Sequence, residues 1–147
     1  QTILVNNGSV VKLAPGQAKV VNEVQAGRLA LDGPRIVPLE SQVIKDRTRI
    51  LYNGTAVLTL VLDDSGNMVG KPQLTTHGLI DDQEAPYVLE KIFEDVEDVL
   101  IDMSDADIMD DVKVNEAARI AVRRNFRDSH RKRPLTTVHV VRVADEG

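Results

Sequence analysis

The chain has 147 residues with a net charge of −5, and 42% of its residues are apolar but only 3% are aromatic, so a core must consist mainly of Val, Leu, Ile and Ala. Cysteine is absent, which excludes disulfides, thiolate metal sites and cysteine nucleophiles. There is no apolar run near the roughly 20 residues of a membrane span, no signal peptide and no initiating Met, so we expect a cytoplasmic piece of a longer protein.

Residues 1–38 form the first predicted segment, a β-rich arm. Short apolar runs at 3–5 and 10–13 flank an Asn-Gly pair, which predicts a hairpin because Gly supplies the positive φ of a tight turn. Another strand is predicted at 18–24. The arm has few large side chains, and we expect it to pack on a domain outside this sequence.

Residues 39–53 are predicted to be a connector with a short helix at about 42–52. Residues 54–147 then predict a C-terminal α/β domain in the order ββααβ. The predicted elements are strands at 55–62 and 68–75, helices at 83–103 and 110–130, and a strand at 135–143.

The fold class predicted from this order is α+β, with a three-stranded sheet backed by two helices. The run at 55–62 is almost wholly apolar apart from threonine, which favours the central position in the sheet. Pro72 lies in the second strand and favours an edge position, since proline cannot donate a ladder hydrogen bond.

Two helices on one side leave the other sheet face open, and both alternating sets of the 55–62 strand are aliphatic. We expect a second subunit to cover this face in a homodimer or higher oligomer, or alternatively the N-terminal arm. The residues predicted for self-association are Leu58, Leu60, Val138 and Val140. Lys at Val57 is expected to unfold the domain if Val57 faces the helices, and Lys at Leu58 to give a monomer.

Charge divides sharply along the chain. Residues 81–111 hold 13 acidic residues and one basic residue, whereas residues 112–133 hold eight basic and two acidic residues. The two predicted helices can therefore attract each other, or each can meet a different partner.

Candidate catalytic and metal-binding patterns are weak. His77, His130 and His139 lack the spacing that places two imidazoles on one metal. The 63–67 segment resembles a cation loop but lacks the terminal Glu of an EF-hand, so a hairpin turn explains it better. We predict no catalytic and no metal-binding residue in this chain.

The end of the basic helix is the one predicted polyanion contact. Arginine binds phosphate well, and Phe126 would either stack on a base or belong to the core. The residues predicted to bind RNA are Arg123, Arg124, Arg127, Arg131, Lys132 and Arg133. Alternatively, the arginines simply face the acidic helix.

A basic turn, two strands and an acidic helix start follow one another in residues 43–84, which read VIKDRTRILYNGTAVLTLVLDDSGNMVGKPQLTTHGLIDDQE. Together with residues 7–16 and 24–33, and with Arg133-Pro134 before a Val-rich strand, they resemble the C-terminal region of bacterial ribonuclease J. That family belongs to the metallo-β-lactamase/β-CASP ribonucleases, and the resemblance covers nearly the whole chain.

The resemblance implies an accessory, oligomerisation domain of a zinc-dependent hydrolase that processes and degrades RNA as a 5′-3′ exonuclease and endonuclease. Its zinc ligands lie in motifs upstream, so no cofactor is expected in this chain, which we predict to be inactive alone. Implied partners are a second copy, RNA through the intact enzyme and RNA-decay proteins. The alternative is a stand-alone interaction module that recruits RNA-decay or ribosomal partners through its acidic helix.

Overall fold

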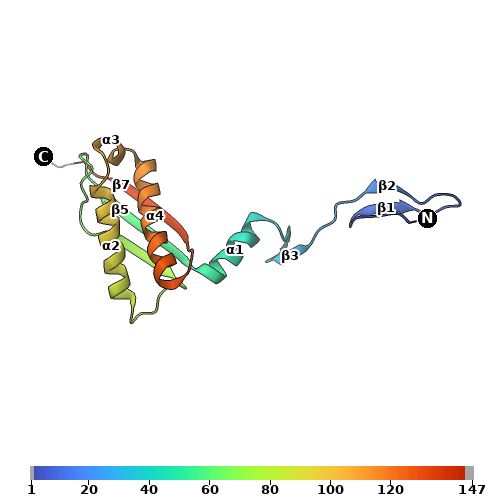
Figure 1. Cartoon of the computed structure of the whole chain (residues 1–147), viewed down its shortest axis with the longest axis horizontal. Coiled ribbons are helices and arrows are strands. Elements are labelled where there is room, and N and C mark those ends of the chain that lie inside the picture. The colour runs from blue at the N-terminus through green and yellow to red at the C-terminus, as the bar shows by residue number, and fades with distance from the viewer. Residues whose placement is uncertain (1, 145–147) are drawn as a thin grey trace. The chain divides into compact units, whose positions relative to one another are not determined.

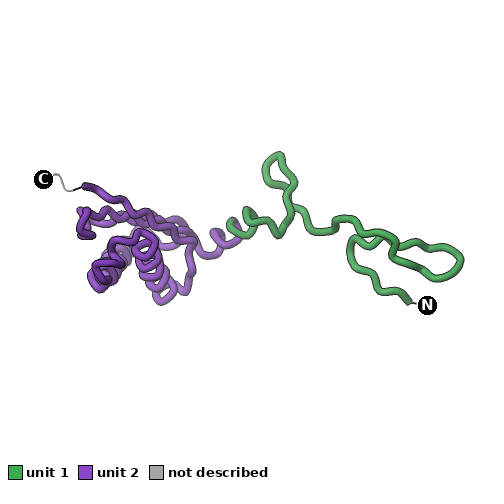
Figure 2. The backbone as a smooth tube through the Cα atoms, turned by 90° about the horizontal axis from the view of Figure 1, so that it is seen from above, with its two compact units in different colours: residues 1–46 green, residues 47–147 purple. Residues whose placement is uncertain are grey.

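The computed structural model describes residues 2–144, so the predicted segment ends at residues 1 and 145–147 lie outside the described residues. The chain separates into two compact units, residues 1–46 (the first unit) and residues 47–147 (the second unit) (Figure 2). The division falls within the connector predicted at 39–53.

The first unit consists of two antiparallel hairpins. Their strands are β1 (Ser9–Lys12) with β2 (Lys19–Glu23), and β3 (Leu29–Asp32) with β4 (Arg35–Pro38). Asp32 is the one buried residue among those described in this unit. The unit therefore holds little core of its own, because most of its apolar side chains remain exposed.

The hairpin predicted between residues 3–5 and 10–13 is wrong. Ser9 N donates to Asn6 O at 3.0 Å, so the turn forms, but residues 3–5 make no strand and β1 pairs with β2. Gly8 has a φ of 96°, and a Cβ there would lie 2.4 Å from Val24 O. Glycine is needed at this position because the chain approaches the end of β2 closely, with Val24 N donating to Gly8 O at 2.8 Å.

The second unit confirms the α+β fold class and the three-stranded sheet (Figure 1). Its sheet has the order β6-β5-β7, with β5 antiparallel to β6 and parallel to β7, so the strand at 55–62 is central as predicted. The elements after the first unit are α1 (Gln42–Asn53), which straddles the division, β5 (Thr55–Leu62), β6 (Gln73–His77), α2 (Ala85–Ile101), α3 (Asp105–Ile108), α4 (Asp111–His130) and β7 (Leu135–Arg142).

Two local features of the second unit differ from the sequence prediction. β6 begins five residues later than expected, because Pro72 interrupts the ladder and Met68 meets Leu62 only in an isolated bridge. The predicted loop between the long helices contains α3, whose first turn is capped by the Ser104 hydroxyl accepting from Asp107 N at 3.3 Å.

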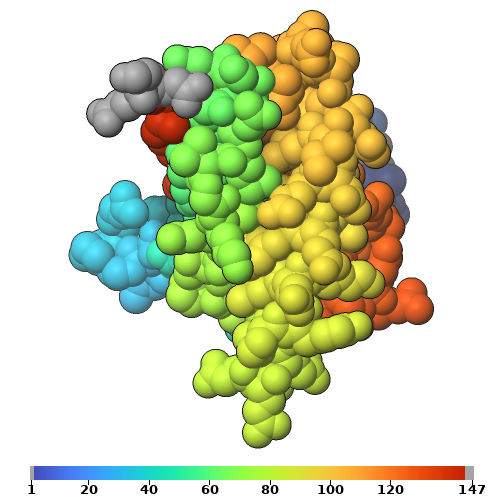
Figure 3. All heavy atoms as spheres, turned by 90° about the vertical axis from the view of Figure 1, so that its left-hand side faces the viewer, coloured from blue at the N-terminus to red at the C-terminus, as the bar shows by residue number. Residues whose placement is uncertain are grey.

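The core of the second unit lies between the sheet and the pair α2 and α4. Every second residue of β5, from Ala56 to Leu62, has an exposed fraction of 0% and faces these helices. From the helices, Ile92 and Val96 meet Phe126 in the same cluster. Figure 3 shows the side chains of α2 (yellow) packed beside those of the β5–β6 segment (green).

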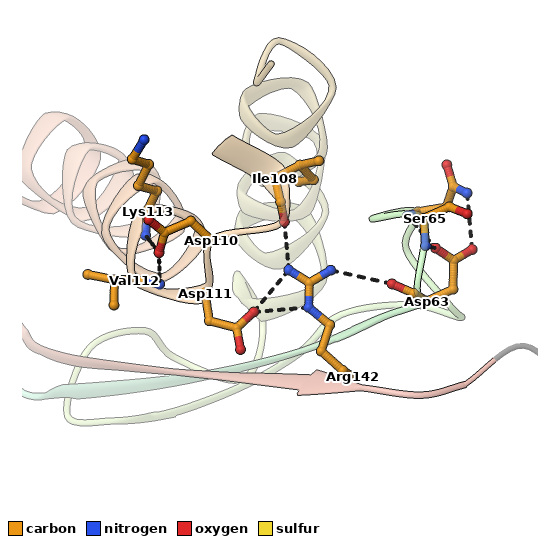
Figure 4. A network of polar contacts seen from close by, with 9 residues as sticks. Asp63, Ser65, Ile108, Asp110, Asp111, Val112, Lys113 and Arg142 are labelled. Carbon is orange, nitrogen blue, oxygen red and sulfur yellow. Dashed lines mark hydrogen bonds and ion pairs between the residues drawn. The ribbon is translucent and has the colours of Figure 1, made fainter. Parts of the chain in front are cut away.

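The end of β7 is fixed to the helical layer by Arg142 (Figure 4). Its guanidinium donates to the Asp111 carboxylate at 2.9 Å, to Ile108 O at 2.6 Å and to Asp63 O at 3.3 Å. One half-buried side chain thereby joins the last strand, the α3–α4 junction and the β5–β6 turn. Such a charge-assisted network restrains three segments that are distant in sequence.

Candidate functional site

The sheet of the second unit has one face that none of the other described residues of that unit cover, which we call the open face. Figure 2 shows α2 and α4 on the same side of the sheet. The open face carries the odd-numbered residues of all three strands. In register across the sheet these are Thr75, Val57 and Thr137, then Gln73, Thr59 and His139, then Val61 and Val141.

Aliphatic side chains gather at one end of the open face. Val69 N donates to Val61 O at 2.8 Å, which places Val69 beside the central strand. Val69 is 45% exposed and Val141 is 43% exposed, with the half-buried Val61 between them. Threonine and histidine occupy the neighbouring rows, so the open face combines an apolar end with a polar middle.

The residues predicted for self-association point the wrong way. Leu58 and Leu60 have exposed fractions of 0% and Val138 of 5%, and all three belong to the core beneath the helices. Val140 is half-buried against the same core. The side of β5 that faces away from the helices is that of Val57, so the roles expected for Lys at Val57 and at Leu58 are exchanged.

The second candidate surface is a hollow of about 300 Å³, which we call the arginine pocket. It is formed by α4 and the connection from α4 to β7. Its lining residues are Ile120, Arg123, Arg124, Arg127 and Arg133. Four of the six residues predicted to bind RNA therefore lie together.

Positive charge is concentrated around Arg123. Burial lowers the pKa of Arg123 below its ordinary value, and the charges of Arg119, Arg49 and Arg133 lower that pKa further, whereas the charge of Glu116 raises it. The guanidinium stays charged near neutral pH, since arginine titrates far above it. The cluster is thus a site where positive groups repel one another.

The nearby acidic groups neutralise this cluster only in part. Arg119 donates to both carboxylate oxygens of Glu116, at 2.6 and 2.7 Å from Nη2. Arg124 approaches Asp95 of the acidic helix at 4.0 Å. The attraction expected between the two charged helices is therefore limited to a few contacts, among them Asn125 Nδ2 donating to Asp95 at 2.7 Å.

Three further residues of the basic segment lie outside the arginine pocket. Phe126 is fully buried, so of its two predicted roles the structure supports the one in the core. Lys132 Nζ donates to Gly78 O at 3.0 Å and lines a different hollow beside Glu84 and His130. Arg131 ends α4 with a φ of 56°, a left-handed conformation that turns the chain away, and it does not line the arginine pocket.

The sequence prediction missed Arg49 and Arg119. Arg119, Arg123 and Arg127 recur at four-residue steps, so helical spacing alone places Arg119 on the pocket side of α4. Arg49 lies in α1, which precedes the sheet. The approach of Arg49 to the arginine pocket depends on the fold. Asn53 Oδ1 accepts from Arg133 N at 2.9 Å, and this bond holds the end of α1 to the α4–β7 connection.

Among residues 2–144, no three His, Asp or Glu side chains converge so as to hold a metal ion, so these residues do not fit the zinc that the resemblance implies for the intact enzyme. None of the helices formed by these residues has the length and the apolar composition that a membrane span requires.

Comparison with known families now places the chain. The profile of the ribonuclease J C-terminal domain matches residues 42–143, which includes α1 and all of the three-stranded sheet. The chain belongs to this family. The sequence resemblance to the C-terminal region of ribonuclease J is thereby confirmed.

Individual relatives agree with this assignment. Ribonuclease J of Sinorhizobium meliloti is 30% identical over 138 residues, 93% of this chain and 24% of the relative. Ribonuclease J of Mycobacterium tuberculosis is 24% identical over 141 residues, 96% of this chain and 25% of the relative. The chain thus spans about a quarter of the length of these ribonucleases.

Proposed function

We propose that this chain is the accessory C-terminal part of a ribonuclease J-type enzyme in RNA processing and decay, and that it mediates self-association through the open face. The observation that carries the proposal is the exposed aliphatic end of that face, formed by Val61, Val69 and Val141. Exposed apolar surface of this kind is stabilised by burial against a partner. Two copies related by a two-fold axis would cover it with the same surface.

Catalysis is assigned by this proposal to parts of the enzyme outside the chain. Hydrolysis of RNA, in 5′-3′ exonucleolytic or endonucleolytic mode, and the zinc of a metallo-β-lactamase core belong to those parts. The residues of this chain would act by holding subunits together.

Light scattering coupled to size exclusion at high micromolar concentration tests the self-association. The wild-type chain is expected to run as a dimer or higher oligomer, and Val141→Lys as a folded monomer, since a charge would be buried in the contact. Ile101→Lys is the matched control, because Ile101 is 78% exposed at the end of α2 and off the open face. A wild-type chain that runs as a monomer overturns the proposal.

A stand-alone interaction module is the competing function. α2 carries exposed acidic side chains, such as Glu90, Glu94 and Asp98, that form no ion pair with other residues of the described range. A metallo-β-lactamase reading frame directly upstream in the same gene supports the accessory role, and its absence supports the module.

A further inference from the structure

The arginine pocket has the charge of an anion site whose ligand is absent from the chain itself. Arg123 and Arg133 line it, and neither guanidinium forms an ion pair with a carboxylate of residues 2–144. None of the lining residues is acidic. The acidic side chains of the chain neutralise only part of the repulsion among these arginines. A bound anion would offset the repulsion that remains.

The lining of the pocket suits phosphate groups. Four of its five lining residues are arginines, and Ile120 is the fifth. Planar guanidinium groups pair with phosphate oxygens through two parallel hydrogen bonds. Several such groups side by side suit successive phosphates of one chain.

An exposed aromatic side chain lies on the helix that borders the cluster. Tyr52 is 72% exposed and follows Arg49 by three residues in α1, so both occupy one face of that helix. Arg49 is near enough to Arg123 for its charge to act on it. Basic side chains combined with exposed aromatic rings bind single-stranded nucleic acid, and Tyr52 is the exposed ring on the helix that carries Arg49.

The backbone around the cluster holds these parts in place. Besides the bond from Arg133 N to Asn53, Leu135 N donates to Gly54 O at 3.1 Å. Gly54 has a φ of 69°, and a Cβ there would lie 2.5 Å from His77 O, so α1 ends close against β6. The helix bearing Arg49 and Tyr52 is therefore anchored to the connection that carries Arg133.

We propose that the arginine pocket binds the phosphodiester backbone of single-stranded RNA, with a base stacked on Tyr52. This site is independent of self-association, because it lies on α1, α4 and the α4–β7 connection and uses no residue of the open face. It gives the chain a direct contact with RNA besides holding subunits together.

Fluorescence anisotropy of the full chain with a 5′-fluorescein-labelled 16-nucleotide poly(U) RNA tests the site. Arg123→Gln combined with Arg133→Gln is expected to weaken binding at least about tenfold. The slope of log affinity against log salt should fall by about 1.4, since each phosphate contact on a single strand contributes about 0.7. The matched control, Lys71→Gln with Lys91→Gln, removes the same charge from exposed positions elsewhere and should change the affinity less than about twofold.

Tyr52 supplies a second variant that leaves the charge unchanged. Tyr52→Ala should weaken RNA binding severalfold, because base stacking is lost, while Tyr52→Phe should retain it. Circular dichroism and light scattering should be the same for all variants as for the wild type, which separates this test from that of self-association.

Three outcomes overturn the proposal. One is a wild-type chain that fails to bind the RNA, and another is a double arginine variant that binds it as the control does. The third is arginine-dependent binding of a fluorescent poly-glutamate peptide in place of the RNA, which would assign the pocket to an acidic protein partner.

Discussion

The two units use their apolar residues in opposite ways. In the first unit Leu31 is 77% exposed and Ile36 is 69% exposed, whereas in the second unit Leu58 and Leu60 are fully buried. Hairpins whose strands have only four or five residues have too little surface to enclose a core. A sheet with two helices packed on one face can enclose a core between the two layers. The second unit should therefore fold on its own, and the first should depend on a surface that it meets elsewhere.

Hydrogen exchange should show the largest contrast between the units. Amides of residues 1–38 are expected to exchange rapidly, since few buried contacts oppose their opening, and those of β5 and α4 to exchange only through global unfolding. The measurement is exchange followed by mass spectrometry on the full chain. Equal protection in both regions would show that the first unit packs on a core or on another copy.

The second largest contrast is expected between a core substitution in the second unit and a surface substitution in the first. Phe126→Ala is expected to lower the free energy of unfolding by roughly 3–5 kcal/mol, because the side chain is fully buried. Leu31→Ala, at an exposed position of the first unit, should change it by less than about 0.5 kcal/mol. Urea denaturation followed by circular dichroism measures both, and a similar loss in the two variants would contradict the contrast.

Two arginines, one in each unit, should also differ in how much they contribute to the free energy of unfolding. Arg142→Ala should cost roughly 1–2 kcal/mol, because the side chain is 23% exposed and two backbone carbonyls lose their donor. Arg35→Ala in the first unit breaks an ion pair with Asp32 at 3.4 Å, and the Arg35 side chain is 73% exposed. This variant should lower the free energy of unfolding by less than about 0.5 kcal/mol. Equal costs for the two would mean that the Arg142 network contributes nothing beyond a surface ion pair.

The smallest predicted effect depends on pH. The Asn67 side chain, with backbone amides of the same turn, lowers the pKa of Asp63 below its ordinary value of 3.8. The stability that the ionised group adds is therefore complete above pH 3.8 and is lost as the pH falls through the lower, folded pKa. The difference in stability between wild type and Asp63→Ala should shrink over that range, as urea denaturation at a series of pH values would measure.

The strands and helices of the second unit could be predicted from its sequence. Which face of the sheet packs against the helices could not. The run at 55–62 predicts a central strand, yet Val57 and Val61 alternate with Leu58 and Leu60, so apolar pattern alone cannot say which set faces the helices. The threonines Thr55 and Thr59 share the open face and are the signal that the prediction overlooked.

The basic run at the end of α4 and in the connection that follows it, which includes Arg133, is the part of the arginine pocket that the sequence predicted. Arg123, Arg124 and Arg127 lie on consecutive turns, and their grouping follows from helical spacing. Arg49 joins them from 74 residues away, and only the contact between Asn53 and Arg133 brings its helix to the pocket. In the first unit the hairpin prediction failed because short apolar runs have several pairing partners, and the longer β1–β2 ladder formed instead.

Truncation tests the central contrast most directly. A protein of residues 41–147 retains α1 entire, together with Ser41 O, which accepts from Lys45 N at 3.1 Å. Its urea unfolding should be a single cooperative transition with the same midpoint as the main transition of the full chain, since the core lies within the second unit. A truncated protein that is unfolded, or whose midpoint is well below that of the full chain, would contradict the claim that the second unit folds independently.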